Sequence, residues 1–138
     1  MPIHTDTDTR FHIDLDWWVR RGRNLRRFLA EILGDAAADL APAAPLDYID
    51  PGTAEVYQMD PLWVRVLTER VNQPGYITPT TPLTSAVLRA LIENLNRPMT
   101  VVQLHRRINR GSTQTLLRLM QTARIEYGIV PASESQRR

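Results

Sequence analysis

The segment RPMTVVQLHRRINRGSTQTLLRLMQTARIEYGIVPA, residues 97–132, predicts two helices joined by a tight turn and followed by a short strand. Pro98 interrupts any helix that precedes it, and the Thr100 hydroxyl can cap the first helix of the pair. Asn109 and Gly111 tolerate the positive φ angles that a sharp reversal between helices requires. The segment therefore predicts a helix-turn-helix.

The flanking sequence extends this pattern in both directions. Apolar residues recur at helical spacing over residues 81–96, where a Thr-Pro pair can begin a further helix. Residues 112–123 are expected to form the second helix of the pair, capped by their serine. Residues 125–130 alternate in the manner of a strand. The predicted order is therefore helix, extended segment, helix, helix and strand.

This order over residues 81–131 resembles a winged helix-turn-helix domain with a truncated wing. The resemblance implies a three-helix fold that binds DNA or, alternatively, contacts another protein. Three further segments, DLDWW at 14–18, DPGTAEV at 50–56 and ITPTTPL at 77–83, together resemble a small family of uncharacterised bacterial proteins. This second resemblance supports the domain order alone, because that family has no established activity to transfer.

The N-terminal half predicts a separate subdomain that begins with a long helix. Alternation over residues 11–15 indicates a short strand, and residues 17–33 are expected to form one helix capped by Asp16 and ended by Gly34. Arg21 falls within the apolar face of that helix, unlike the other arginines nearby. We therefore expect Arg21 to be buried and paired with a carboxylate.

A hairpin and a further helix complete the N-terminal subdomain. Two β-favouring segments flank the Asp-Pro-Gly of residues 50–52, and an Asp-Pro pair at residues 60–61 can begin a helix. We predict an α+β, mostly helical protein, in which a helix and hairpin subdomain precedes the winged-helix-like subdomain. Its predicted parts are residues 1–75, which begin with a frayed tail at 1–9, then residues 76–132, and a disordered tail at 133–138.

The composition excludes several kinds of chemistry. All 17 basic residues are arginine, and the sequence contains neither lysine nor cysteine. Disulfides, cysteine-based metal sites, Schiff-base catalysis and a phosphate-loop lysine are therefore excluded. Residues 1–75 carry 8 Arg and 12 acidic residues, a net charge of −4, whereas residues 76–138 carry 9 Arg and 3 Glu, a net charge of +6. A polyanion is expected to meet the C-terminal half.

Hydropathy and cysteine content indicate the cellular compartment in which the protein is expected. No apolar run approaches the length of a membrane span, and the first residues lack the basic and apolar pattern of a signal peptide. The absence of cysteine fits a reducing compartment. We therefore expect a cytoplasmic protein with no membrane partner.

The residues that could carry catalysis or bind a metal have structural explanations. Asp14 and Asp16 have the spacing of a haloacid-dehalogenase-type phosphotransferase motif, but that chemistry requires a lysine, and helix capping explains them better. With His12 they could bind a divalent cation on one extended strand, although a solvated strand face is the simpler interpretation. No serine lies in a nucleophile elbow, and no glycine-rich phosphate loop is present. We predict that the protein is not an enzyme and needs no metal or cofactor.

The candidate functional residues lie on the second helix of the predicted helix-turn-helix and around its turn. If residues 112–123 are a recognition helix, three polar side chains share its outward face and are candidates for reading bases: Gln114, Arg118 and Gln121. Four nearby arginines are candidates for phosphate contacts: Arg106, Arg107, Arg110 and Arg124.

Two functions follow from this pattern. The first is a DNA-binding protein, a transcriptional regulator that contacts double-stranded DNA while its N-terminal subdomain mediates homodimerisation or partner binding. The second is a non-enzymatic adaptor that presents the same winged helix to a protein partner. The choice between them, the target and any effector are left open by the sequence.

Overall fold

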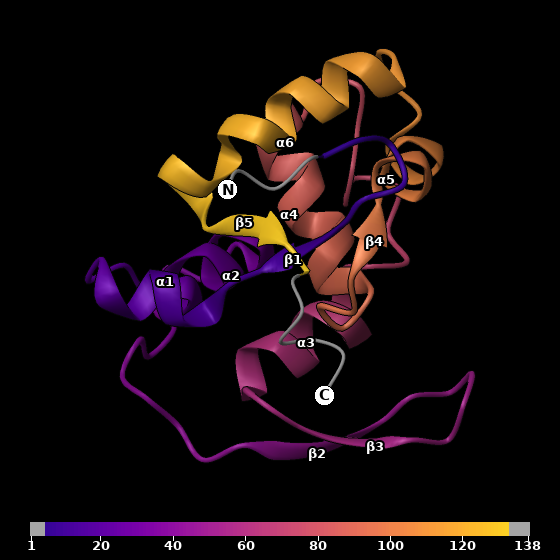
Figure 1. The fold of residues 1–138 in the computed structure, drawn as a ribbon. Coiled ribbons are helices and arrows are strands. Elements are labelled where there is room, and N and C mark those ends of the chain that lie inside the picture. Colours follow the sequence, from indigo (N-terminus) through magenta and orange to yellow (C-terminus); the bar gives the residue numbers. More distant parts are fainter. Residues whose placement is uncertain (1–4, 133–138) are drawn as a thin grey trace. The chain divides into compact units, whose positions relative to one another are not determined.

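A computed structural model describes residues 5–132, apart from the side chains of residues 123–126, so the tail predicted at residues 133–138 lies outside the described residues. The fold is α+β and has two compact units, one built from residues 1–22 and 77–138, the other from residues 23–76. The described elements (Figure 1) are, in chain order, β1 (Arg10–Ile13), α1 (Leu15–Arg20), α2 (Leu25–Leu33), β2 (Leu46–Ile49), β3 (Val56–Met59), α3 (Pro61–Glu69), α4 (Leu83–Glu93), β4 (Met99–Thr100), α5 (Val101–Ile108), α6 (Thr113–Tyr127) and β5 (Ile129–Pro131).

In the first unit, β1 is the central strand of a three-stranded antiparallel sheet with the order β4, β1, β5. Phe11 pairs with Met99 of β4 on one side and with Pro131 of β5 on the other. Figure 1 shows the N-terminal strand enclosed by these two segments of the C-terminal stretch. This grouping differs from the sequence-based division at residue 75, because pairing between strands distant in sequence leaves no local pattern.

Beyond the end of β4, the side chain of Asn96 forms the hydrogen bonds to β1 that a longer strand would form. β4 has two residues and reaches no further along β1 than Phe11. Beyond it, the Ile13 N–H donates to Asn96 Oδ1 at 2.7 Å, and Asn96 Nδ2 donates to the Ile13 carbonyl at 2.9 Å. Asn96 has a φ of 57°, a left-handed conformation that asparagine tolerates better than most residues. The segment after α4 is thus joined to the central strand.

The helices of this unit bury their apolar faces around the sheet. α4 packs against β1 and α5, and α6 packs against α5 and β5. Each fully buried large side chain contributes about 1.5–3 kcal/mol of transfer free energy, so this cluster stabilises the unit. Its largest members are Phe11, Ile13, Val87, Leu88, Leu91, Ile92, Leu104, Leu116, Met120 and Ile129.

The single helix predicted over residues 17–33 is wrong, because the chain forms two shorter helices there. α1 ends at Arg20, and Gly22 has a φ of 65°, which a right-handed helix does not contain. Asn24 then caps α2, and its Oδ1 accepts a hydrogen bond from the Arg26 N–H at 2.9 Å. Glycine and asparagine together terminate one helix and begin the next.

The predicted burial of Arg21 is also wrong, for the same reason. Arg21 is exposed at the C-terminal cap of α1, and its guanidinium carbon lies 5.4 Å from the ring centroid of Trp17. The more buried arginine is Arg26, whose side chain is 12% exposed and whose Nε lies 2.8 Å from the Asp60 carboxylate. Because α2 begins a new helical phase after Asn24, periodicity counted across the break assigns burial to the wrong arginine.

The second unit, residues 23–76, contains the hairpin and the helix that the sequence predicts. Leu46 pairs with Met59 and Ile49 pairs with Val56, so β2 and β3 are antiparallel and in register. The helix predicted to follow the hairpin is present as α3 and packs against α2. Both predictions are confirmed.

α6 continues to Tyr127, so the C-terminal strand begins later than predicted, at Ile129. Gly128 makes the change of direction with a φ of 62°. Two contacts from α1 lie at this point. Trp18 Nε1 donates to the Tyr127 carbonyl at 2.9 Å, and a Cβ placed on Gly128 would lie 2.7 Å from Cε3 of Trp17. Packing against α1 therefore determines where α6 ends.

Gly128→Ala is expected to lower the free energy of unfolding by about 3 kcal/mol or more, because the new methyl group meets both an unfavourable φ and the Trp17 ring. Gly111→Ala is the matched control: its φ is 70°, but nothing lies within 4 Å of its Cβ position. That control is expected to cost about 1–2 kcal/mol. Equilibrium urea unfolding measures both, and equal losses would contradict the packing of Trp17 against Gly128.

Candidate nucleic-acid interface

Local hydrogen bonds determine the geometry of α5 and of the turn that leads to α6. Thr100 and Gln103 form a reciprocal capping box, in which the Gln103 N–H donates to Thr100 Oγ1 at 3.0 Å and the Thr100 N–H donates to Gln103 Oε1 at 2.9 Å. The positive φ angles predicted at Asn109 and Gly111 are confirmed, at 55° and 70°. His105 Nε2 lies 2.8 Å from the Gly111 carbonyl and closes the turn.

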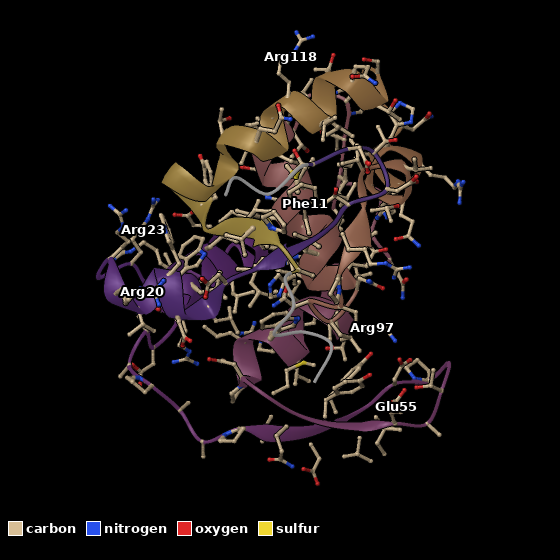
Figure 2. All side chains as sticks on the ribbon, in the orientation of Figure 1. Phe11, Arg20, Arg23, Glu55, Arg97 and Arg118 are labelled. Carbon is tan, nitrogen blue, oxygen red and sulfur yellow. The ribbon has the colours of Figure 1, made fainter. Side chains whose placement is uncertain are left out.

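α6 has a buried face and an exposed face. Leu116 and Met120 are 0% and 2% exposed on the inner face. The three side chains proposed to read bases, Gln114, Arg118 and Gln121, are all exposed. Figure 2 shows the Arg118 side chain extending outward from α6, away from the rest of its unit. These three residues, which we call the α6 stripe, lie on the face of α6 that is opposite the hydrophobic core.

One residue of the α6 stripe already has an intramolecular partner. Gln121 Nε2 donates to Thr5 Oγ1 at 3.1 Å. Within the described part of the chain, the side chains of Gln114 and Arg118 make no hydrogen bond or ion pair. The stripe is therefore open at Gln114 and Arg118 and partly engaged at Gln121.

Arg106 and Arg107 are neighbours in sequence but have different surroundings. Arg106 is exposed on α5. Arg107 forms a bidentate ion pair with Glu93 of α4, with Nη2–Oε1 at 2.7 Å and Nε–Oε2 at 3.0 Å. The two side chains are 35% and 27% exposed. A guanidinium held in this way joins α4 to α5, and its charge is offset by the carboxylate.

Arg110 also binds groups of its own unit. Its Nη1 donates to the carbonyls of Pro79 at 2.6 Å and Thr78 at 3.3 Å, which ties the turn to the segment before α4. The side chain of Arg124, the fourth phosphate candidate, lies outside the described residues. Of the four candidates, Arg106 is thus the one described as exposed.

The charge asymmetry of the sequence persists when residues are grouped by compact unit. Residues 1–22 and 77–138 carry 12 Arg and 7 acidic residues, a net charge of +5. Residues 23–76 carry 5 Arg and 8 acidic residues, a net charge of −3. A polyanion is therefore attracted to the unit that contains α6 and repelled by the other.

The possible metal ligands at the N-terminus do not share a strand face. His12 lies in β1, whereas Asp14 is the N-cap of α1 and Asp16 lies in its first turn. Asp14 Oδ1 accepts from the Trp17 N–H at 3.2 Å, so Asp14 has the capping role that the sequence analysis assigned to Asp16. In the described residues, no group of three His, Asp or Glu side chains is placed to hold a metal ion.

No protein-family model, curated protein or solved structure matches this chain. None of the described helices combines the length and the apolar character needed to cross a membrane.

The contacts that the sequence analysis missed join distant parts of the chain. The Asn96–Ile13 bonds span 83 residues, and the Gln121–Thr5 bond spans 116. Thr5, the partner of Gln121, falls within residues 1–9, for which the sequence predicts a frayed tail. Helical periodicity and capping rules carry no information about such partners.

The His12 imidazole provides a test of the sheet through pH. Burial lowers its pKa from the usual 6.5, and the Asp14 carboxylate opposes that shift. Folding therefore favours the neutral ring, so its contribution to stability is present above pH 6.5 and is lost as the pH falls through the lowered folded-state value. Between about pH 8 and about pH 5, the free energy of unfolding should fall more for the wild type than for His12→Gln. Parallel curves from urea unfolding would contradict the burial of this ring.

Arg107→Ala is expected to lower the free energy of unfolding by about 1–2 kcal/mol, because it leaves the half-buried Glu93 without its partner. The exposed neighbour provides the control, and Arg106→Ala should change stability by less than about 0.5 kcal/mol. A double-mutant cycle with Glu93→Gln isolates the coupling in urea unfolding experiments. Indistinguishable stabilities of the two arginine variants would show that the ion pair does not contribute.

Proposed function

We propose that the unit containing α6 binds double-stranded DNA and that the protein acts as a transcriptional regulator. In this proposal, α5 and α6 are a helix-turn-helix, α6 is the recognition helix, and the β4–β1–β5 sheet takes the place of a truncated wing. The observation that carries the proposal is the exposed α6 stripe opposite a fully buried apolar face. A recognition helix needs both faces at once, one for packing and one for the major groove.

The chemistry of the α6 stripe suits the edges of purine bases. The Arg118 guanidinium can donate two hydrogen bonds to guanine, and the Gln114 side chain can pair with adenine in a bidentate manner. In this proposal Arg106, which is exposed on the preceding helix, contacts a phosphate and sets the docking angle. The net charge of +5 on this unit adds a sequence-independent attraction through counterion release.

A second candidate function is a protein-interaction adaptor that uses the same surface. The observation in its favour is that Arg107 and Arg110 are engaged by Glu93 and by backbone carbonyls. This leaves fewer arginines for a phosphate backbone than the sequence suggested. In either case we propose a non-enzymatic, cytoplasmic protein, with the acidic unit available for homodimerisation or partner binding.

The test begins with selection of a preferred duplex from a random oligonucleotide pool, followed by fluorescence-anisotropy titrations at several salt concentrations. Arg106→Ala should weaken binding to all sequences alike and reduce the salt-dependence slope by about one unit. Arg118→Ala should cost roughly 1–3 kcal/mol on the preferred site and little on random duplexes.

Arg27→Ala is the matched control, because Arg27 is an exposed arginine of the acidic unit. It removes the same charge and should leave both affinity and sequence preference nearly unchanged. Similar losses from Arg27→Ala and Arg118→Ala would exclude α6 as the recognition helix. If the wild-type protein shows no duplex affinity above background at moderate salt, the DNA-binding proposal is wrong and the adaptor function is favoured.

A further inference from the structure

Residues 5–9, which we call the N-terminal arm, are docked beside α5 and α6. The arm makes its own turn, in which the Asp6 N–H donates to Thr9 Oγ1 at 2.9 Å and the Thr9 N–H donates to the Asp6 carbonyl at 3.1 Å. Two bonds reach the helices. The Thr7 carbonyl accepts from the Val102 N–H at 3.4 Å, and Thr5 Oγ1 accepts from Gln121 Nε2. Figure 1 shows the arm entering β1 from the side where α5 and α6 lie.

The arm is acidic in an otherwise basic unit. Asp6 and Asp8 are exposed, and no arginine precedes Arg10 in the sequence. Both aspartates flank Thr7, whose carbonyl meets an N–H in the first turn of α5. The docked arm thus places the Thr7 carbonyl, with an acidic residue on each side of it, at the positive end of the α5 dipole.

In its docked position, the acidic arm would repel the negatively charged phosphates of a DNA duplex. A recognition helix in the major groove is flanked by the phosphate backbones of both strands. The arm contacts the α6 stripe at Gln121, so the segment that carries the two aspartates runs beside the face that would enter the groove. A carboxylate within about 10 Å of a phosphate is repelled by it, and salt screens this repulsion. Gln121 must also leave Thr5 before it can meet a base.

We propose that the N-terminal arm is an electrostatic guard of the α6 stripe, which lowers affinity for DNA and must be displaced or neutralised for tight binding. This inference rests on the proposed DNA-binding function and adds a regulatory element to the same site. The guard acts in two ways: Asp6 and Asp8 repel the phosphates, and Thr5 occupies the amide of Gln121. Gln114 and Arg118 are open, so the guard weakens recognition without blocking it.

The experiment compares two variants that change the net charge equally. Asp6→Asn/Asp8→Asn neutralises the arm, and the amide oxygen introduced at position 6 can still accept the hydrogen bond that the Asp8 N–H donates to Asp6 at 2.9 Å in the wild type. Glu31→Gln/Glu55→Gln neutralises two exposed acids of the other unit. At low salt the arm variant should bind the preferred duplex on the order of fivefold more tightly than the wild type, with the gain shrinking as salt is raised. The control should change affinity by less than about twofold, as distant screened charges do.

The outcomes separate the guard from the function on which it rests. Duplex affinity in the wild type, with equal gains in the arm variant and the control, overturns the guard and leaves DNA binding intact. No affinity in any of the three proteins overturns both. Affinity that appears in the arm variant alone supports both. A further variant, Thr5→Val, keeps every charge and releases Gln121, and the guard predicts a smaller gain that survives at high salt. No gain from Thr5→Val would remove the contribution of that hydrogen bond.

Discussion

Hydrogen bonding along β1 holds the first unit together, because β4 and β5 each have β1 as their neighbour in the sheet. β4 has two residues and β5 has three, which is too short for either to form a stable sheet alone. The central strand comes from the opposite end of the chain, and Asn96 extends its pairing beyond β4. The helices α4, α5 and α6 bury their apolar faces around this strand. The unit that carries the candidate interface therefore cannot be complete without the N-terminal residues.

The same constraint explains why an acidic segment lies beside the α6 stripe. Since β1 is enclosed by β4 and β5, residues 5–9 must leave the sheet next to the start of α5. From there they reach Gln121. The other end of β1 leads directly into α1, whose tryptophans meet the end of α6. One strand thus places contacts at Gln121, near the middle of the proposed recognition helix, and at its C-terminal end, and leaves the N-terminal half with Gln114 and Arg118 exposed.

The arginines show how a basic composition divides between stability and surface charge. Arg26, Arg107 and Arg110 are engaged by carboxylates or carbonyls of their own units. Arg106 and Arg118 are exposed, with side chains that make no hydrogen bond to the described residues. A count of arginines therefore overstates what is available to a polyanion, because an engaged guanidinium has already committed some of its N–H donors and is held in place by its partners. The proposed interface depends on a small number of exposed residues and on the net charge of the unit.

The sequence by itself determined the features that depend on neighbouring residues. The capping box at Thr100, the left-handed turn at Asn109 and Gly111, the β2–β3 hairpin and the outward direction of the α6 stripe all follow from local conformational preference and helical period. Only the tertiary structure decided the rest: the strand order around β1, the end of α6 against Trp17, the engagement of Arg107, and the half-buried ion pair of Arg26 with Asp60. The physical reason is that packing selects hydrogen-bond and ion-pair partners from positions tens of residues apart. Local sequence patterns describe only neighbouring residues, so they do not identify such partners.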